Sequence, residues 1–189
     1  MKNIILIIIA LFLNIKSFSQ PVEKGTIHMN AGIGFPNNLG RLFKAISSLN
    51  GDVKVKSSPV LQFSLDATVS DEFQIGILYG HTSVKMKEKH DGGNGFTYTS
   101  EQKITSTIIG LKLEYVTELN SKSTLYGGPT ILYSLIQFKP DIGYLNKIDG
   151  IGIYPHLGIT RKFSKSTSGY LELGYGMALI NTGVKVRLK

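Results

Sequence analysis

Apolar and polar residues alternate one by one along much of the chain, and the alternation is clearest in residues 108–135. Two alternating runs flank a polar turn at residues 118–122 in this region. The first run places four apolar side chains on one face, namely Ile109, Leu111, Leu113 and Tyr115. Successive side chains of a strand point to opposite faces, so a period of two predicts strands with one face in an apolar medium and one in a polar medium. We expect this region to form a β-hairpin.

The same pattern recurs before and after the hairpin and predicts eight strands in total. Besides the hairpin at residues 104–138, the expected strands cover residues 25–35, 60–69, 72–85, 151–163, 169–176 and 182–188. Their number is even, and most of them approach the ~9–11 residues that a tilted strand needs to cross a bilayer. The predicted fold class is all-β, and the predicted architecture is an eight-stranded antiparallel up-and-down transmembrane β-barrel.

The connections between the expected strands alternate in length. Short polar connections at residues 70–71, 118–123 and 164–168 alternate with long ones at residues 36–59, 88–101 and 140–150. Outer-membrane barrels have short turns on the periplasmic side and longer loops outside the cell. We therefore expect the short turns at the periplasmic end, although residues 178–181 form a short connection where a long loop is expected.

The first long connection contains an apolar stripe with a helical period. Its members are Leu39, Leu42, Phe43, Ile46 and Leu49, while Arg41 and Lys44 lie off the stripe. Asn37 or Asn38 can cap the start of a helix here. An amphipathic helix in this loop can cap the barrel mouth, lie on the leaflet surface or hold a partner.

Aromatic residues on the apolar face gather near both ends of the expected strands. Those near the expected periplasmic end are Phe73, Tyr115 and Phe163, and those in the outer half are Phe35, Tyr79, Tyr133 and Tyr175. Aromatic side chains are enriched at lipid–water interfaces. Two aromatic belts predict that the apolar face is the outer face of the barrel, in contact with lipid.

The polar face carries charged residues that would then point into the barrel. They are Asp66, Lys112, Glu114, Glu172, Lys185 and Arg187. The interior of an eight-stranded barrel is just wide enough for side chains to fill, and charges removed from water need partners. Three acids and three bases can pair with one another, so we expect a lumen plugged by an ion-pair network.

The beginning of the chain has the features of a secretory signal peptide. A short basic segment, Met1-Lys2-Asn3, precedes the apolar run from Ile4 to Leu13, and Ser17-Phe18-Ser19 provides small residues before a cleavage site. We expect cleavage after residue 19, which leaves residues 20–189 as the barrel domain. The formal charge is +8, but the basic residues are scattered, so lipid headgroups are expected as partners and nucleic acid is not.

Few residues of the chain are suited to catalysis or metal binding. The chain has no cysteine, and its four histidines lack metal-ligand spacing, so no metal and no cofactor are expected. His81 and Ser83 point to the same face of an expected strand and form the one arrangement that is typical of a catalytic pair. His28 and His156 fall on the lumen face, where we expect hydrogen-bonded core residues.

The signal, the alternating strands and the final segments resemble a known family. The final segments are Leu171-Glu-Leu-Gly-Tyr-Gly-Met-Ala and Asn181-Thr-Gly-Val-Lys-Val-Arg-Leu. They are similar to the small eight-stranded outer-membrane β-barrel domains of the OmpA/OmpX-like type, and the signal is similar to those of Bacteroidota. The resemblance implies a monomer in the cell outer membrane that contacts lipopolysaccharide and is inserted by the outer-membrane assembly machinery. It also implies a structural or surface-interaction role through the long loops, without enzymatic activity.

Two alternatives remain open. His81-Thr82-Ser83 is similar to the His-x-Ser of outer-membrane lipid A deacylases, which implies an enzyme that modifies lipid A. The second alternative is a soluble periplasmic barrel that turns its apolar face inward to hold a lipid.

Overall fold

The computed structural model describes residues 24–48, 53–91, 97–140, 146–174 and 176–188. The expected signal at residues 1–19 and the aromatic residue Tyr175 lie outside the described residues. The elements are β1 (Ile27–Asn37), α2 (Asn38–Ser47), β2 (Val53–Ser57), β3 (Val60–Ser70), β4 (Phe73–Asp91), β5 (Thr97–Asn120), β6 (Ser123–Pro140), β7 (Asn146–Lys162), β8 (Thr167–Gly174) and β9 (Ala178–Arg187). No helix within the described ranges is long and apolar enough to cross a membrane.

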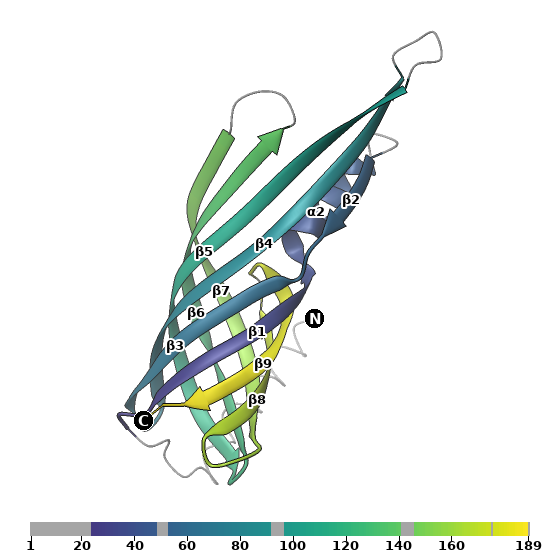
Figure 1. Cartoon of the computed structure of the whole chain (residues 1–189). Coiled ribbons are helices and arrows are strands. Elements are labelled where there is room, and N and C mark those ends of the chain that lie inside the picture. The colour runs from purple at the N-terminus through teal and green to yellow at the C-terminus, as the bar shows by residue number, and fades with distance from the viewer. Residues whose placement is uncertain (1–23, 49–52, 92–96, 141–145, 175, 189) are drawn as a thin grey trace, which may run out of the picture.

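Eight of these strands close into an antiparallel ring (Figure 1). β3 to β9 pair in chain order, and β1 lies between β3 and β9. Closure leaves no free sheet edge where the first and last strands meet. The prediction of an eight-stranded antiparallel up-and-down barrel is confirmed.

The ring is staggered, as one row of cross-strand partners shows. The row starts at Ile159 of β7, crosses β8, β9, β1, β3, β4, β5 and β6, and returns to β7 at Asp149. A return point ten residues away (159 to 149) on eight strands corresponds to a strand tilt of roughly 40°, given a rise of ~3.3 Å per residue and a spacing of ~4.8 Å. The strands therefore run diagonally across the wall (Figure 1).

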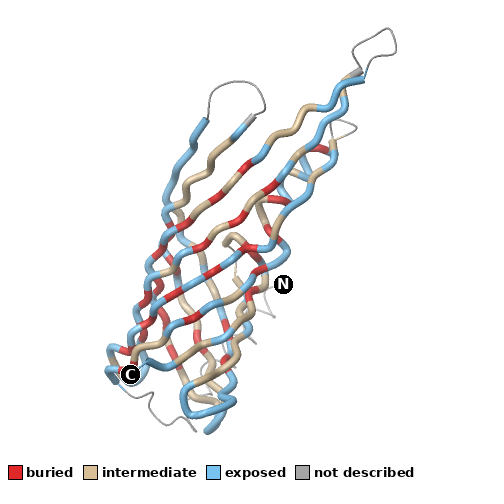
Figure 2. Tube along the Cα trace, viewed as in Figure 1, coloured by how far each residue is buried: buried red, intermediate tan, exposed pale blue. Residues whose placement is uncertain are grey.

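Buried and exposed residues alternate along the barrel strands (Figure 2), as expected where side chains point in turn to the lumen and to the outer surface. On β3, every second residue from Val60 to Thr68 is buried and the residues between them are exposed. The outward residues are apolar: Ile77 is 62% exposed and Phe63 is 51% exposed, whereas the inward Asp66 is 1% exposed. The apolar face is thus the outer face, and the alternative of a soluble barrel with its apolar face inward is contradicted.

The described aromatic residues of the two predicted belts project outward. In the outer half, Phe35, Tyr79 and Tyr133 are 43–45% exposed, and near the short turns Phe73 is 52% and Phe163 is 72% exposed. The rings of Phe73 and Tyr115 contact each other edge to face, with centroids 5.5 Å apart. The short β3–β4, β5–β6 and β7–β8 connections all lie at the end of the barrel where the final residues of β9 lie (Figure 1).

Several strands are longer than the sequence predicts. β4 and β5 remain paired as far as Asp91 and Thr97, so most of the expected loop at residues 88–101 is strand. β7 begins at Asn146, within the expected loop at residues 140–150, and β9 begins at Ala178, within the expected connection at residues 178–181. Both faces are polar in the outer parts of β4 and β5, so no period-two pattern marks them as strand.

The first long connection contains the predicted helix and an unpredicted strand. In α2, Asn37 is the N-cap, and its side chain accepts a hydrogen bond from the Gly40 amide. β2 continues the line of β3 along β4, because Ser57 pairs with Val84 and Leu61 pairs with His81. The extra residue on the β2–β3 side falls at residues 58–59, where a proline cannot donate to the ladder.

The tight contact between β1 and β9 yields a test of the ring. Gly183→Ala is expected to lower stability by about 1–3 kcal/mol through overpacking. Its Cβ would lie 2.5 Å from Gly32 Cα and 2.8 Å from the Tyr170 ring, whereas the control Gly150→Ala has nothing within 4 Å of its Cβ. Urea titration in detergent micelles, with the folded fraction read from gel migration, gives the unfolding midpoint of each variant. Equal midpoints for the two variants would contradict the prediction.

Candidate functional site: the charged layer of the lumen

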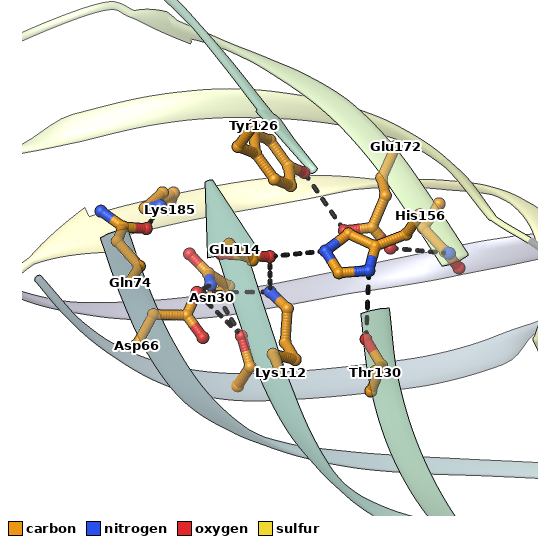
Figure 3. Close-up of polar contacts among 12 residues, drawn as sticks. Asn30, Asp66, Gln74, Lys112, Glu114, Tyr126, Thr130, His156, Glu172 and Lys185 are labelled. Atoms are coloured by element: carbon orange, nitrogen blue, oxygen red, sulfur yellow. Dashed lines mark hydrogen bonds and ion pairs between the residues drawn. The ribbon is translucent and has the colours of Figure 1, made fainter. Parts of the chain in front are cut away.

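Lys112 joins two buried carboxylates across the lumen (Figure 3). Its Nζ lies 2.7 Å from Glu114 Oε1 and 3.4 Å from Asp66 Oδ2. The side chains of all three residues are almost fully buried, at 7% exposure for Lys112 and 1% for each acid. Lys112 and Glu114 are two residues apart on β5 and therefore share its inner face, while Asp66 reaches them from β3. This ion-pair triad is the centre of the site.

His156 of β7 extends the triad toward the opposite wall. Its Nε2 lies 2.9 Å from Glu114 Oε1, and its Nδ1 lies 3.1 Å from the Thr130 hydroxyl. One hydrogen on Nε2 lets His156 donate to Glu114 and accept from Thr130 at Nδ1. Glu114 thus interacts with an ammonium group and with an imidazole, which together offset the cost of burying its charge.

Glu172 and Lys185 lie in the same layer but have neutral partners. Glu172 accepts hydrogen bonds from the Tyr126 hydroxyl and from Asn181 Nδ2, both at 3.3 Å. Lys185 donates to Gln74 Oε1 at 3.2 Å, and its ammonium lies 5.7 Å from the centre of the Tyr126 ring. Within the described residues neither forms an ion pair within 4.0 Å.

Arg187 does not join this cluster. It is exposed at the short-turn end of β9, where it lines a cavity of about 520 Å³. Lys162, Lys165 and Lys185 line the same cavity, and Glu118 is its acidic residue. The predicted set therefore divides into a buried cluster and one residue at the mouth of the barrel.

The sequence reasoning did not name several members of the network. Asn30 donates to Ser64 and to Asp66, and Gln74, Tyr126, Thr130 and Asn181 make the contacts described above. All of them occupy inward positions, so the period-two pattern could have found them, but it does not show which side chains meet. Of the two histidines expected to be hydrogen-bonded, His156 is, whereas the buried Nδ1 of His28 has no hydrogen-bond partner among the described residues.

Among the described residues, one set could hold a metal ion. Glu114, His156 and Glu172 offer ligand atoms that lie within 4.8 Å of one another. However, Glu114 Oε1 already interacts with both the Lys112 ammonium and His156 Nε2, and a cation would have to overcome the ammonium 2.7 Å away. The geometry therefore favours an ion-pair plug at this position.

The structure does not bring His81 and Ser83 together as a catalytic pair. His81 Nδ1 lies 3.1 Å from the Thr107 hydroxyl on the outer face, and the Ser83 hydroxyl lies 3.3 Å from that of Ser58. In the described part of the chain no hydrogen bond links His81 to Ser83, and no carboxylate orients the imidazole as a triad requires.

Comparisons with known proteins give structural likeness only. No protein-family model matches the chain, and no curated protein matches it. Among solved structures, the chain is similar to Ail, the attachment invasion locus protein of Yersinia pestis, in complex with the heparin analogue sucrose octasulfate. That match has 11% identity and a TM-score of 0.44, and it covers 87% of this chain and 96% of Ail. A second structure of Ail matches with 10% identity and a TM-score of 0.41, over the same shares of the two chains.

Removing the cation of the triad tests the site. Lys112→Met is expected to destabilise the barrel by about 3–5 kcal/mol, because Asp66 and Glu114 would remain buried without their ammonium partner. The triple variant Asp66→Asn, Lys112→Met, Glu114→Gln should regain at least half of the lost stability, because it removes the two buried charges as well. Lys122→Met, in an exposed turn, is the control. Urea unfolding measured by gel migration compares the variants. A triple variant no more stable than Lys112→Met alone would argue against pairing as the stabilising interaction.

Proposed function

We propose that this chain is an integral outer-membrane β-barrel whose lumen is closed by side chains and which acts at the cell surface without catalysis. The observation that supports it is the partition of side chains, with ionised groups sealed inside and a continuous apolar surface outside. In water such a surface would be unfavourable by about 25 cal/mol for each Å² of exposed apolar area, whereas a bilayer removes that cost. Cleavage after residue 19, insertion by the outer-membrane assembly machinery and a monomeric state complete the proposal.

The closed lumen favours surface interaction over diffusion. Lys112, Asp66, Glu114 and His156 link β3, β5 and β7 across the interior, and the cavity that the described residues leave beside Asp66 and Lys112 is only about 30 Å³. Among the described residues, the parts available for a partner are α2, β2 and the outer ends of β4 to β7. The described contacts of His81 and Ser83 are with Thr107 and Ser58 and not with each other, so the geometry gives no support to lipid A deacylation.

A row of lysines on the outer surface indicates what that partner is. Lys56 of β2 pairs with Lys85 of β4, Lys85 pairs with Lys103 of β5, and Lys103 pairs with Lys139 of β6. Cross-strand partners share one face of a sheet, and like charges directly opposite each other are destabilising. All four are exposed. Anions from outside the barrel wall would therefore reduce the repulsion within this lysine row.

The nearest acidic residue neutralises only part of the lysine row. Glu101 forms ion pairs with Lys85 at 3.5 Å and with Lys87 at 2.7 Å. The Lys87 ammonium holds the pKa of Glu101 below its usual value, so Glu101 remains ionised. In the described residues no carboxylate lies within 4.0 Å of Lys56, Lys103 or Lys139.

The position of the lysine row fits the headgroups of the outer leaflet. On β4 and β6 it lies six residues outward of Tyr79 and Tyr133, on the same face. Six residues correspond to about 20 Å along a strand, beyond the outer aromatic belt. Phosphate and carboxylate groups of lipopolysaccharide would meet the ammonium groups there, and we assign lipopolysaccharide as the partner of this surface.

Spin labels test the membrane position. Leu111, Ile131 and Tyr98 are all exposed in the isolated barrel, at 42%, 39% and 60%. Labels at positions 111 and 131 should be reached by oxygen and shielded from a water-soluble nickel quencher in outer-membrane vesicles. The label at position 98, near the tip of the β4–β5 hairpin, should show the reverse. Ready access of the nickel quencher to all three would refute membrane embedding.

Charge-neutral variants test the partner. Replacing Lys56, Lys85, Lys103 and Lys139 together by Gln should weaken binding of fluorescent lipopolysaccharide at least tenfold, with a smaller dependence on salt. The control replaces four lysines at the opposite end, namely Lys24, Lys122, Lys162 and Lys165, and therefore removes the same charge. Anisotropy with protein in phospholipid nanodiscs measures both sets. Equal weakening by the two sets would indicate an effect of net charge and would contradict the assignment.

A further inference from the structure

The outer half of the lumen has many apolar side chains beside uncharged polar ones such as Thr82 and Ser106, in contrast to the charged layer beneath it. Its apolar inward residues include Val60, Val84, Ile104, Ile108 and Leu132, which are 0–4% exposed. This part of the lumen departs from the sequence expectation of a polar interior. Above these residues the barrel widens into a second cavity of about 570 Å³, which we call the outer chamber.

The outer chamber is built by five parts of the chain. β5 and β6 contribute Ile108, Leu132 and Ile136, α2 contributes Leu39, Arg41 and Leu42, β7 contributes Tyr154, and the β8–β9 connection contributes Met177. Sites for small molecules are concavities of ~300–1,000 Å³ lined mainly by apolar side chains with a few polar groups. The volume and the lining of the outer chamber both fall within that description.

Within the described residues, part of the apolar side of α2 that faces this space is left uncovered. The edge-to-face contact of Phe43 with Phe138 of β6, with centroids 6.4 Å apart, directs this side across the mouth of the barrel. Leu42, which lines the chamber, is nevertheless 56% exposed. Apolar surface left open beside a concavity is typical of a ligand site. An apolar ligand in the chamber would remove Leu42 from water.

The wall beside the chamber is lower on one side. β7 pairs with β8 only from His156 to Lys162, so in the described residues Asn146–Pro155 of β7 are paired on the β6 side alone. The chamber is lined on that side by Tyr154 and by the connection that contains Met177. A ligand can therefore enter from above or past the edge of β7.

The polar groups at the rim select the kind of ligand. Arg41 lines the chamber, and among the described residues no carboxylate lies within 4.0 Å of its guanidinium. Ser106 and Ser134 are the hydroxyls on the β5 and β6 walls. A guanidinium beside a mainly apolar lining, with no carboxylate partner among the described residues, complements an anionic head on an aliphatic tail, because charge-assisted hydrogen bonds to carboxylates are strong.

We infer that the outer chamber binds a free fatty acid, with the tail between Leu42 and the Ile108–Leu132 wall and the carboxylate at Arg41. Binding would shield the open side of α2 and give its guanidinium a counter-ion. A sugar or nucleotide would leave its polar groups unpaired against this lining. The site is separate from the lysine row, whose side chains lie on the outer face of the wall.

Binding of dansyl-labelled undecanoic acid to the protein in lipid nanodiscs tests the inference. Leu42→Glu should weaken binding at least tenfold, because it places a carboxylate in the chamber. Ile46→Glu is the matched control, since Ile46 belongs to the same helix stripe and is 48% exposed but does not line the chamber.

The role of Arg41 is tested by comparing the binding of a charged and an uncharged ligand. Arg41→Ala should weaken binding of the acid about fivefold or more and leave binding of the uncharged dansyl undecanamide unchanged, whereas Lys44→Ala should change neither. Emission equal to that of empty nanodiscs, or equal losses for Leu42→Glu and Ile46→Glu, would overturn the site. A phospholipid retained through purification and not displaced by undecanoic acid would overturn the assignment of a free fatty acid. Unchanged heat-dependent gel migration confirms that each variant is folded.

Discussion

The pairing of β1 with β9 closes the sheet, and the environment of the barrel side chains depends on it. Antiparallel partners from His28–Arg187 to Asn37–Ala178 join the first strand of the chain to the last one. Closure on eight strands leaves an interior only wide enough for side chains, so the inward residues meet one another. The outward residues meet whatever surrounds the barrel, and their apolar character suits hydrocarbon.

The narrow interior is divided into two layers with different chemistry. In the inner layer, Lys112 offsets the burial of Asp66 and Glu114, and neutral hydrogen bonds hold Glu172 and Lys185. In the outer layer, inward residues such as Ile108 and Leu132 are apolar and need no partners. A charged cluster thus lies below a mainly apolar chamber.

The outer ends of the strands are polar on both faces, and this explains why the sequence did not reveal them. From Lys85 to Asp91, β4 continues its ladder with β5, although its residues no longer alternate between apolar and polar. Strand pairing continues there because each strand extends the hydrogen bonds of its neighbour. The same registers place Lys56, Lys85, Lys103 and Lys139 in one row. The sequence alone does not predict this row, because its four residues lie far apart along the chain.

The sequence by itself determined the eight barrel strands and the face on which each of their side chains lies, because a period of two needs only local sterics. It thereby placed Asp66, Lys112 and Glu114 inside and Ile77 and Tyr133 outside. It did not determine β2 or the outer ends of β4, β5 and β7. Only the tertiary structure decided which inward residues touch. The stagger of the ring sets which residues of different strands lie at one height, and it brings Lys112 between two acids while Arg187 lies at the mouth. That stagger is a property of the closed ring, and no single strand contains it.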